Sequence, residues 1–94
     1  MLVLSRKLDE SLVVNNTLNV KLSAVKYNQA HFSWGDTSAI LSPGDSVEVM
    51  PDVVFHLLRA GRYQARVSID APRHIPVHRK EIHERILSGV RHEA

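Results

Sequence analysis

The residues best suited to binding chemistry lie close together in one stretch of the C-terminal third, from Ile69 to Ile82. This stretch carries the cations Arg73, Arg79 and Lys80, and it spans the end of one predicted strand, a turn and the start of a predicted helix. A guanidinium is a planar fork that can pair with a phosphate or with the O6 and N7 edge of guanine, and an ammonium adds a point charge. Residues of these types in this pattern indicate recognition of a polyanion.

The positive charge of the chain is concentrated around this stretch. Residues 59–94 carry eight Lys or Arg against four Asp or Glu, whereas residues 1–58 carry four against six, although the net charge of the whole chain is only +2. A basic segment of this kind is typical of proteins with polyanionic partners. On charge alone a solvated charged surface is the simpler explanation, so the assignment depends on the surrounding residues.

Other kinds of site find little support. His74, His78 and His83 are spread across a strand–helix junction, and no cysteine or carboxylate completes a metal-ligand set with them. The sequence contains no phosphate loop, no nucleophile elbow and no readable pair of catalytic carboxylates. We therefore expect no metal site, no cofactor and no enzymatic activity.

Most of the chain that must position these residues alternates between apolar and polar side chains, which predicts strands that are buried on one face. Residues 52–60 are ambiguous between strand and helix, because Asp52 could cap a helix and Gly61 could end one. Apolar residues then recur every fourth position, at Ile82, Ile86 and Val90, and predict an amphipathic helix from residue 79 onward. The expected strands are residues 1–6, 11–14, 18–23, 29–34, 40–41, 47–49, 63–69 and 75–77, with a loop over 35–39.

An internal repeat favours a strand over residues 53–57. When the sequence is compared with itself at a shift of 35 residues, the alternating apolar positions of the two segments coincide. The first strand also matches residues 40–43 if two residues are dropped. We therefore expect that a unit of three strands was duplicated and that one further strand and a helix follow it. The shift places residues 11–14 on 46–49, 18–22 on 53–57 and 29–34 on 64–69.

At 94 residues the chain is one small domain, 1–94, with little surface to bury. Either its strands form an unusually complete core or an oligomer supplies the rest. It has no cysteine, which is consistent with the cytoplasm, and its N-terminal charges follow too short an apolar run for a signal peptide. We expect a mainly β fold, a small antiparallel, barrel-like sheet domain with a C-terminal α-helix.

Several motifs, in order along the chain, resemble the carbon storage regulator family (CsrA/RsmA), small bacterial RNA-binding proteins. Residues 1–7 followed by 10–12 are similar to the opening strand and turn of the family, and residues 25–29 resemble its second turn. Residues 64–72 and 77–86 are similar to its later strands and its helix. Together these segments cover about half of the chain at both of its ends.

The resemblance implies a protein that binds GGA-containing RNA loops in messenger leaders, and so controls translation or stability of the messenger. The implied subunit has five strands and dimerises by interleaving them, so that the first strand of one subunit lies beside the fifth strand of the other. The implied partners are messenger leaders, with no membrane, and antagonist small RNAs or a protein antagonist are left open. The RNA-binding residues implied by position are Leu2, Leu4, Ser5, Arg6, Lys7, Ile75, Val77, His78, Arg79, Lys80 and Ile82.

The chain departs from the family in two ways. Leu8, Ala24 and Tyr27 stand where the family often has turn glycines, and residues from about 35 to 61 form an inserted or duplicated segment. The second copy of the first strand has Pro43 where Arg6 stands, so we expect it not to bind RNA. The chain is therefore either a subunit of a homodimer or a single-chain pseudo-dimer. An alternative function is a protein-interaction or decoy module that keeps the fold and has lost specific RNA binding.

Overall fold

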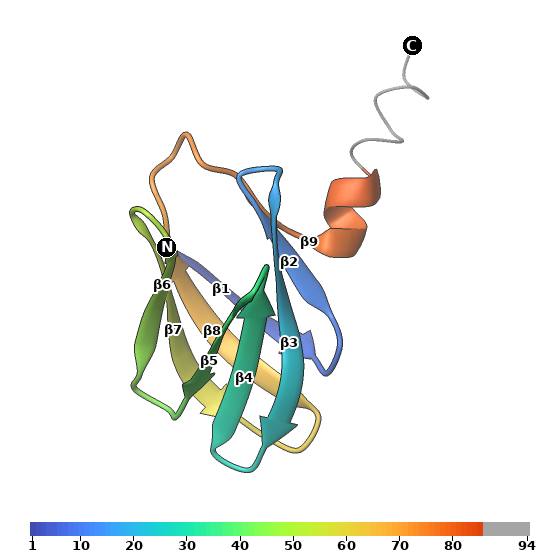
Figure 1. The fold of residues 1–94 in the computed structure, drawn as a ribbon, viewed down its shortest axis with the longest axis vertical. Helices are drawn as coiled ribbons and strands as arrows, with labels where there is room; N and C mark the ends of the chain where they lie inside the picture. Colours follow the sequence, from blue (N-terminus) through green and yellow to red (C-terminus); the bar gives the residue numbers. More distant parts are fainter. Residues whose placement is uncertain (86–94) are drawn as a thin grey trace.

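The computed structural model describes residues 1–85, which form two antiparallel β-sheets followed by the start of a helix (Figure 1). The first sheet has the strand order β1-β8-β7-β6, and the second has the order β5-β4-β3-β2-β9. The mainly β class with a C-terminal helix is thus confirmed. The strands are β1 (Leu2–Lys7), β2 (Ser11–Val14), β3 (Leu18–Lys26), β4 (Gln29–Trp34), β5 (Thr37–Leu41), β6 (Ser46–Met50), β7 (Val53–Ala60), β8 (Gln64–Asp70) and β9 (Val77–Arg79).

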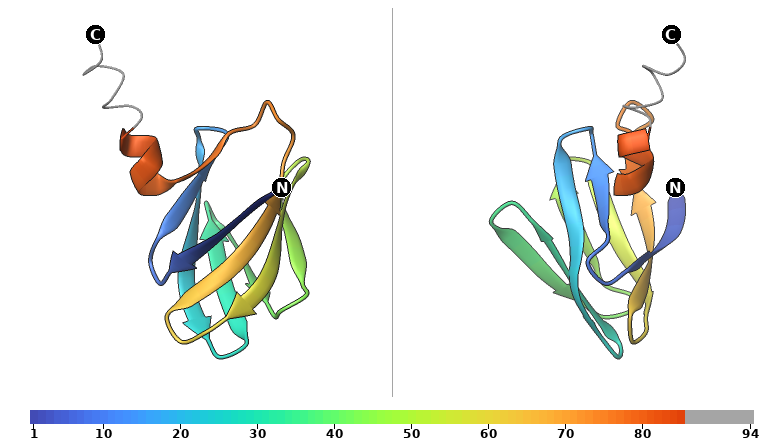
Figure 2. Two further views of the ribbon diagram at one scale, coloured as in Figure 1. Left: turned by 180° about the vertical axis from the view of Figure 1, so that it is seen from behind. Right: turned by 90° about the vertical axis from the view of Figure 1, so that its right-hand side faces the viewer.

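The 35-residue shift expected from the sequence relates β1, β2, β3 and β4 to β5, β6, β7 and β8 in that order. The repeat also holds for the pairing register. Leu2 lies opposite Ile69 where β1 pairs with β8, and the equivalent residues Thr37 and Trp34 lie opposite each other where β5 pairs with β4. The first strand of each copy therefore belongs to the sheet that contains the other copy, and Figure 2 shows β1 lying along β8.

Irregularities of the strands repeat as well. A bulge interrupts the pairing of β3 with β4 between Leu22 and Ala24, and a bulge interrupts the pairing of β7 with β8 between Leu57 and Arg59, 35 residues later. The turn after β1 has an amide hydrogen bond from Asp9 to the carbonyl of Leu22 (2.8 Å), and Gly44 donates to Leu57 at the same place in the second copy (2.9 Å). Duplicated bulges and turns indicate two copies of one folding unit.

The core fills the space between the two sheets. Most strands turn alternate side chains inward, as the sequence pattern predicts. Phe32 of β4 and Phe55 of β7, which belong to different sheets, meet edge to face with ring centroids 6.0 Å apart. Trp34 is buried in the same core, with 9% of its surface exposed. The largest fully buried side chains are Phe32, Phe55, Leu12, Leu22, Leu57, Ile69, Val14, Val20, Val53 and Val67. Apolar packing between the copies joins them into one unit.

Three expectations from the sequence were wrong in detail. Residues 37–39, expected in a loop, open β5, because the two-residue turn of Gly35 and Asp36 is enough to reverse the chain. The short strand expected at 75–77 is instead β9 at Val77–Arg79, with residue 75 in a turn closed by its amide bond to the Pro72 carbonyl. The first strands overlay without dropped residues, so that Leu41, and not Pro43, takes the place of Arg6.

Two further outcomes concern the end of the chain. The ambiguous segment 52–60 is strand β7, as the repeat favours. The helix begins at residue 80 and is described through residue 85, so the expected apolar positions Ile86 and Val90 lie outside the described residues. The carboxylate of Glu81 binds Arg6 of β1 and not Arg85, which lies one turn further along the helix. Within residues 1–85 no helix is long and apolar enough to cross a bilayer.

Candidate nucleic-acid interface

The candidate site lies where β1 and β9, the edge strands of the two sheets, come together beside the start of the helix (Figure 1). β8 ends at Asp70, and the chain then crosses from one sheet to the other through a turn that begins at Pro72. The amide of Asn15 donates to the carbonyl of Pro76 (2.8 Å), and β9 then pairs antiparallel with β2. This crossing places the basic C-terminal segment against the first strand of the chain.

Arg6 ties β1 to the start of the helix. Its guanidinium donates two hydrogen bonds to the carboxylate of Glu81, from Nη1 to Oε1 (3.1 Å) and from Nη2 to Oε2 (3.0 Å). Nη1 also donates to the carbonyl of Ser11 (3.1 Å). The side chain of Arg6 is 5% exposed and that of Glu81 is 51% exposed. Because its donors are occupied inside the protein, Arg6 positions the site and does not present a cation to a ligand.

The same contact sets the charge of Glu81. The hydrogen bonds from Arg6, with a backbone hydrogen bond and the nearby positive charge of Arg79, lower the pKa of this carboxyl from 4.5 to about 2. Glu81 is therefore ionised at every pH at which the protein is expected to act, and it holds the Arg6 charge neutralised within the fold.

An apolar pocket of about 250 Å³ opens between the N-terminal end of β1 and the segment that leads into β9. Leu2 is 41% exposed, and Ile75 and Val77 are half-buried, so the pocket presents aliphatic surface to solvent. Unstacked RNA bases are bound on such surfaces, with specificity supplied by polar groups at the rim. The residues that line the pocket are Met1, Leu2, Ile69, Ala71, Pro72, Arg73, Ile75 and Val77.

Three exposed cations come from the same segment as the pocket wall: Arg73 from the crossing loop, Arg79 from the end of β9 and Lys80 from the first turn of the helix. Within residues 1–85 no carboxylate lies within ion-pair distance of any of the three. In particular, Arg79 forms no ion pair with Glu81 or Glu84, the two carboxylates nearest to it in the described helix. These cations have their donors available for phosphates or base edges.

The free edge of β1 supplies a second kind of recognition group. Among residues 1–85, β1 pairs with β8 on one side only, so alternate backbone N–H and C=O groups along its other side have no partner strand there. Strand edges of this kind can bind a ligand through backbone hydrogen bonds. Leu4 is 5% exposed and belongs to the core, so it contributes through its backbone and not through its side chain.

The structure brings most of the predicted residues to this junction. Ser5 and Lys7 lie further along β1, opposite Arg66 and Gln64, and so point to a neighbouring part of the surface. Two further predicted residues on the C-terminal side are half-buried, His78 in β9 and Ile82 in the helix. The sequence analysis did not assign Ala71, Pro72 and Arg73 to the site. Two features could have indicated them: the proline that ends the preceding strand, and an arginine within a basic segment.

Within residues 1–85 no three His, Asp or Glu side chains gather to hold a metal ion.

Within residues 1–85 this junction combines two edge strands, a pocket lined mainly by aliphatic side chains and three cations without an ion-pair partner. Comparison with known proteins identifies the family of the chain. Residues 42–88 match the CsrA family, described as the global regulator protein family. The chain is 29% identical over 86 residues to the translational regulator CsrA of Rhodopirellula baltica, across 92% of this chain and 73% of that protein. It is 35% identical over 43 residues to the translational regulator CsrA of Bacillus velezensis, across 46% of this chain and 58% of that protein.

The chain belongs to the CsrA family of global regulators, and it is a regulatory protein and not an enzyme. No solved structure matches it significantly. The family match begins at Ser42, after β5, and continues through β6 to β9 into the helix. Strands β1 to β5 therefore lie outside the matched segment, which is consistent with an added copy of part of the family unit.

Proposed function

We propose that this protein regulates translation by binding single-stranded or loop RNA that contains GGA in messenger leaders. The observation that carries the proposal is the junction of β1 and β9, where the two motifs that resemble the family meet around one apolar pocket with Arg73, Arg79 and Lys80 beside it. The resemblance supplies the GGA sequence. Bound at a leader, a protein of this size would exclude the ribosome by occupying its site.

Within this proposal each group has a distinct task. The pocket formed by Leu2, Ile75 and Val77 accepts an unstacked base, and the free edge of β1 reads polar base edges through its backbone. Arg79 binds guanine or an adjacent phosphate through its fork of donors. Arg6 and Glu81 keep β1 and the helix start in register without contacting the RNA.

We further propose that the chain acts as one domain with a single RNA site. β9 pairs with β2, but the corresponding edge of β6 has no such strand among residues 1–85, because β4 is joined directly to β5 by two residues. Leu41 replaces Arg6 at the second copy of the junction, so the contact that fixes the helix start has no counterpart. A one-site protein would bind one RNA hairpin per chain and would lack the avidity of a two-site dimer.

Titration of a short hairpin with GGA in its loop, with the mass of the complex measured in solution, tests both proposals. We expect one hairpin per chain and a loss of affinity of about 10- to 100-fold in Arg79→Gln, since a bidentate contact to a base contributes about 1–3 kcal/mol. Arg62→Gln removes the same charge from the exposed β7–β8 turn and serves as the matched control. Equal losses in both variants would contradict the assigned site, and two hairpins per two tightly associated chains would contradict the single-chain arrangement.

A further inference from the structure

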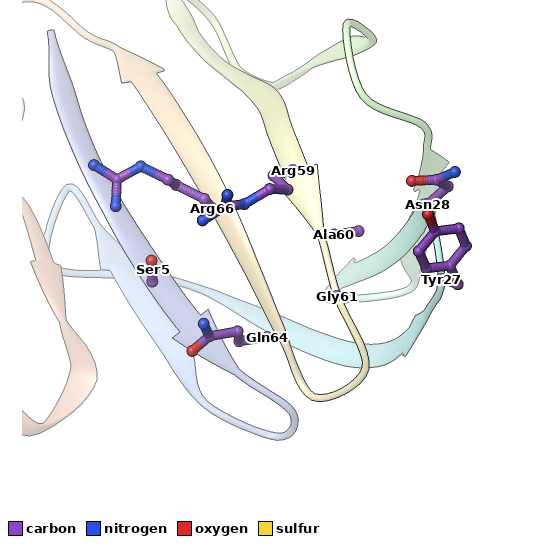
Figure 3. A pocket seen from close by; sticks show the side chains of 8 residues that line it. All are labelled: Ser5, Tyr27, Asn28, Arg59, Ala60, Gly61, Gln64 and Arg66. Atoms are coloured by element: carbon purple, nitrogen blue, oxygen red, sulfur yellow. The ribbon is translucent and has the colours of Figure 1, made fainter.

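A second pocket, of about 350 Å³, lies at the opposite end of β1 from the apolar pocket (Figure 3). It is formed on the outer surface of the first sheet, where the end of β7 meets the β3–β4 turn of the second sheet. Its volume falls in the range of small-molecule sites. The lining residues are Ser5, Tyr27, Asn28, Arg59, Ala60, Gly61, Gln64 and Arg66.

Two arginines lie side by side in this pocket. Arg59 of β7 and Arg66 of β8 are direct cross-strand neighbours and both are exposed. In Figure 3 their side chains extend in the same direction, that of Arg59 over β8 and that of Arg66 over β1. Within residues 1–85 no carboxylate lies within ion-pair distance of either arginine. Like charges directly opposite each other destabilise a sheet, so this pair has a cost that a bound anion would remove.

The fold itself does not require the two arginines. The other copy of the unit forms the same bulge between β3 and β4, and there the equivalent residues are Ala24 and His31, which also lie opposite each other. Ser5, which pairs with Arg66 on its other side, offers a hydroxyl and no charge. The local doubling of positive charge is therefore a property of this pocket and not of the bulge.

An exposed aromatic ring lies at the other end of the same pocket. Tyr27 is 79% exposed at the tip of the β3–β4 turn, where the next residue, Asn28, has a φ of +62°. The Asn28 amide donates to the carbonyl of Ala60 (3.4 Å), which holds this turn against the end of β7. In Figure 3 Tyr27 and Asn28 approach from the side of Ala60 opposite the arginines. An exposed tyrosine beside unpaired arginines is the combination that binds a base by stacking and its phosphate by charge.

We propose that this pocket is a second contact site for single-stranded RNA, which binds a nucleotide that flanks the segment held at the β1–β9 junction. Arg59 and Arg66 bind phosphate, and Tyr27 stacks on the base. The inference rests on the proposed RNA-binding function. Leu2 lines the first pocket and Ser5 the second; they are three residues apart on β1, about 10 Å along the strand, and their side chains point to opposite faces of it. A single strand that passes round the free edge of β1 needs at least about three nucleotides, at ~3.4 Å each, to reach both sites.

The test compares two RNAs, a minimal hairpin with GGA in its loop and the same hairpin extended by six single-stranded nucleotides at each end. We expect the wild-type protein to bind the extended RNA about tenfold more tightly, because stacking of one base contributes a factor of this order by substitution. The double variant Tyr27→Ala/Arg59→Gln should bind the minimal hairpin normally and lose the gain from the extension. Arg62→Gln, in the same region but outside the pocket, should keep the gain.

Salt dependence gives an independent readout. The logarithm of affinity for single-stranded RNA falls with the logarithm of salt concentration by about 0.7 for each phosphate neutralised. Removing both arginines in Arg59→Gln/Arg66→Gln should lower that slope by about 1.4 for the extended RNA and leave it unchanged for the minimal hairpin. A hairpin that binds without any gain from the extension, or a gain that survives in the double variants, would overturn the second site alone. Absence of binding by both RNAs would overturn the proposed function and this site with it.

Discussion

Replacing Glu81 by glutamine removes the charge that holds Arg6 in place while keeping the size of the side chain. The side chain of Arg6 is 5% exposed. It would then retain as partners the carbonyls of Ser5 and Ser11 and the more distant carboxylate of Glu10, at 3.7 Å. Removing the ionised partner of a buried cation destabilises the folded state, because the remaining charge is left uncompensated. We expect Glu81→Gln to lower the free energy of unfolding and to loosen the start of the helix against β1.

The magnitude follows from the pKa of Glu81 and its exposure. A fall in pKa from 4.5 to about 2 would correspond to about 3 kcal/mol if the carboxylate were shielded from water. The side chain of Glu81 is 51% exposed, so solvent screening reduces the expected contribution to about 1 kcal/mol. A loss of that size lowers the melting temperature of a domain of this length by about 4–8 °C.

The effect should depend on pH in one direction. Since the folded pKa of Glu81 lies below the unfolded value, its stabilising contribution is fully present above pH 4.5 and is lost as the pH falls toward 2. Urea unfolding of the wild type and of Glu81→Gln should therefore differ by about 1 kcal/mol at pH 7 and converge in acid. Glu84→Gln is the matched control, because Glu84 makes no ion pair within residues 1–85. A difference that stays constant down to pH 2.5, or that equals the difference for Glu84→Gln, would refute the assigned role of the ion pair.

Three further substitutions test the fold. Phe55→Ala should cost about 3–5 kcal/mol in urea unfolding, because Phe55 is fully buried against Phe32 and the cavity cannot fill; a cost below 1 kcal/mol would contradict the packing. Ser68→Ala should be neutral or stabilising by up to about 1 kcal/mol in the same assay, since the buried Ser68 hydroxyl has no hydrogen-bond partner within residues 1–85. Asp9→Gly should raise the melting temperature slightly, because Asp9 has a φ of +70° at the place where the second copy has Gly44; a fall would show that the Asp9 side chain matters more than its backbone.

Local pattern was enough to predict most of the strands. Alternation identified the inward faces correctly, and the 35-residue repeat settled the strand at 53–60, where the local signals conflicted. The expected strand at 75–77 was displaced because the chain uses residues 71–76 to cross between the sheets before the β9 pairing can begin. The length of chain needed to cross from one sheet to the other depends on the tertiary arrangement of the sheets, and the alternation of apolar residues does not reveal it.

The candidate site was predicted by position and not by side-chain role. Arg6 stood at the expected place, yet its burial and its bond to Glu81 could not be read from the sequence, where Glu81 had a closer candidate in Arg85. An ion pair between residues 75 positions apart depends on the crossing of the chain between the two sheets. The position of Leu4 in the apolar–polar alternation is that of a core residue, and its side chain is buried. Only its backbone groups can therefore contribute to the site.

The difference between the two ends of the molecule follows from chain connectivity. After β8 the chain is free to continue, and it uses residues 71–76 to reach the other sheet and form β9. After β4 the equivalent position is occupied by the turn at Gly35 and Asp36, which leads at once into β5. One chain cannot both close that hairpin and send a strand across to β6. A duplication that exchanges first strands within one chain therefore has to omit one of the two late strands, and with it the segment that carries the counterparts of Arg79 and Lys80.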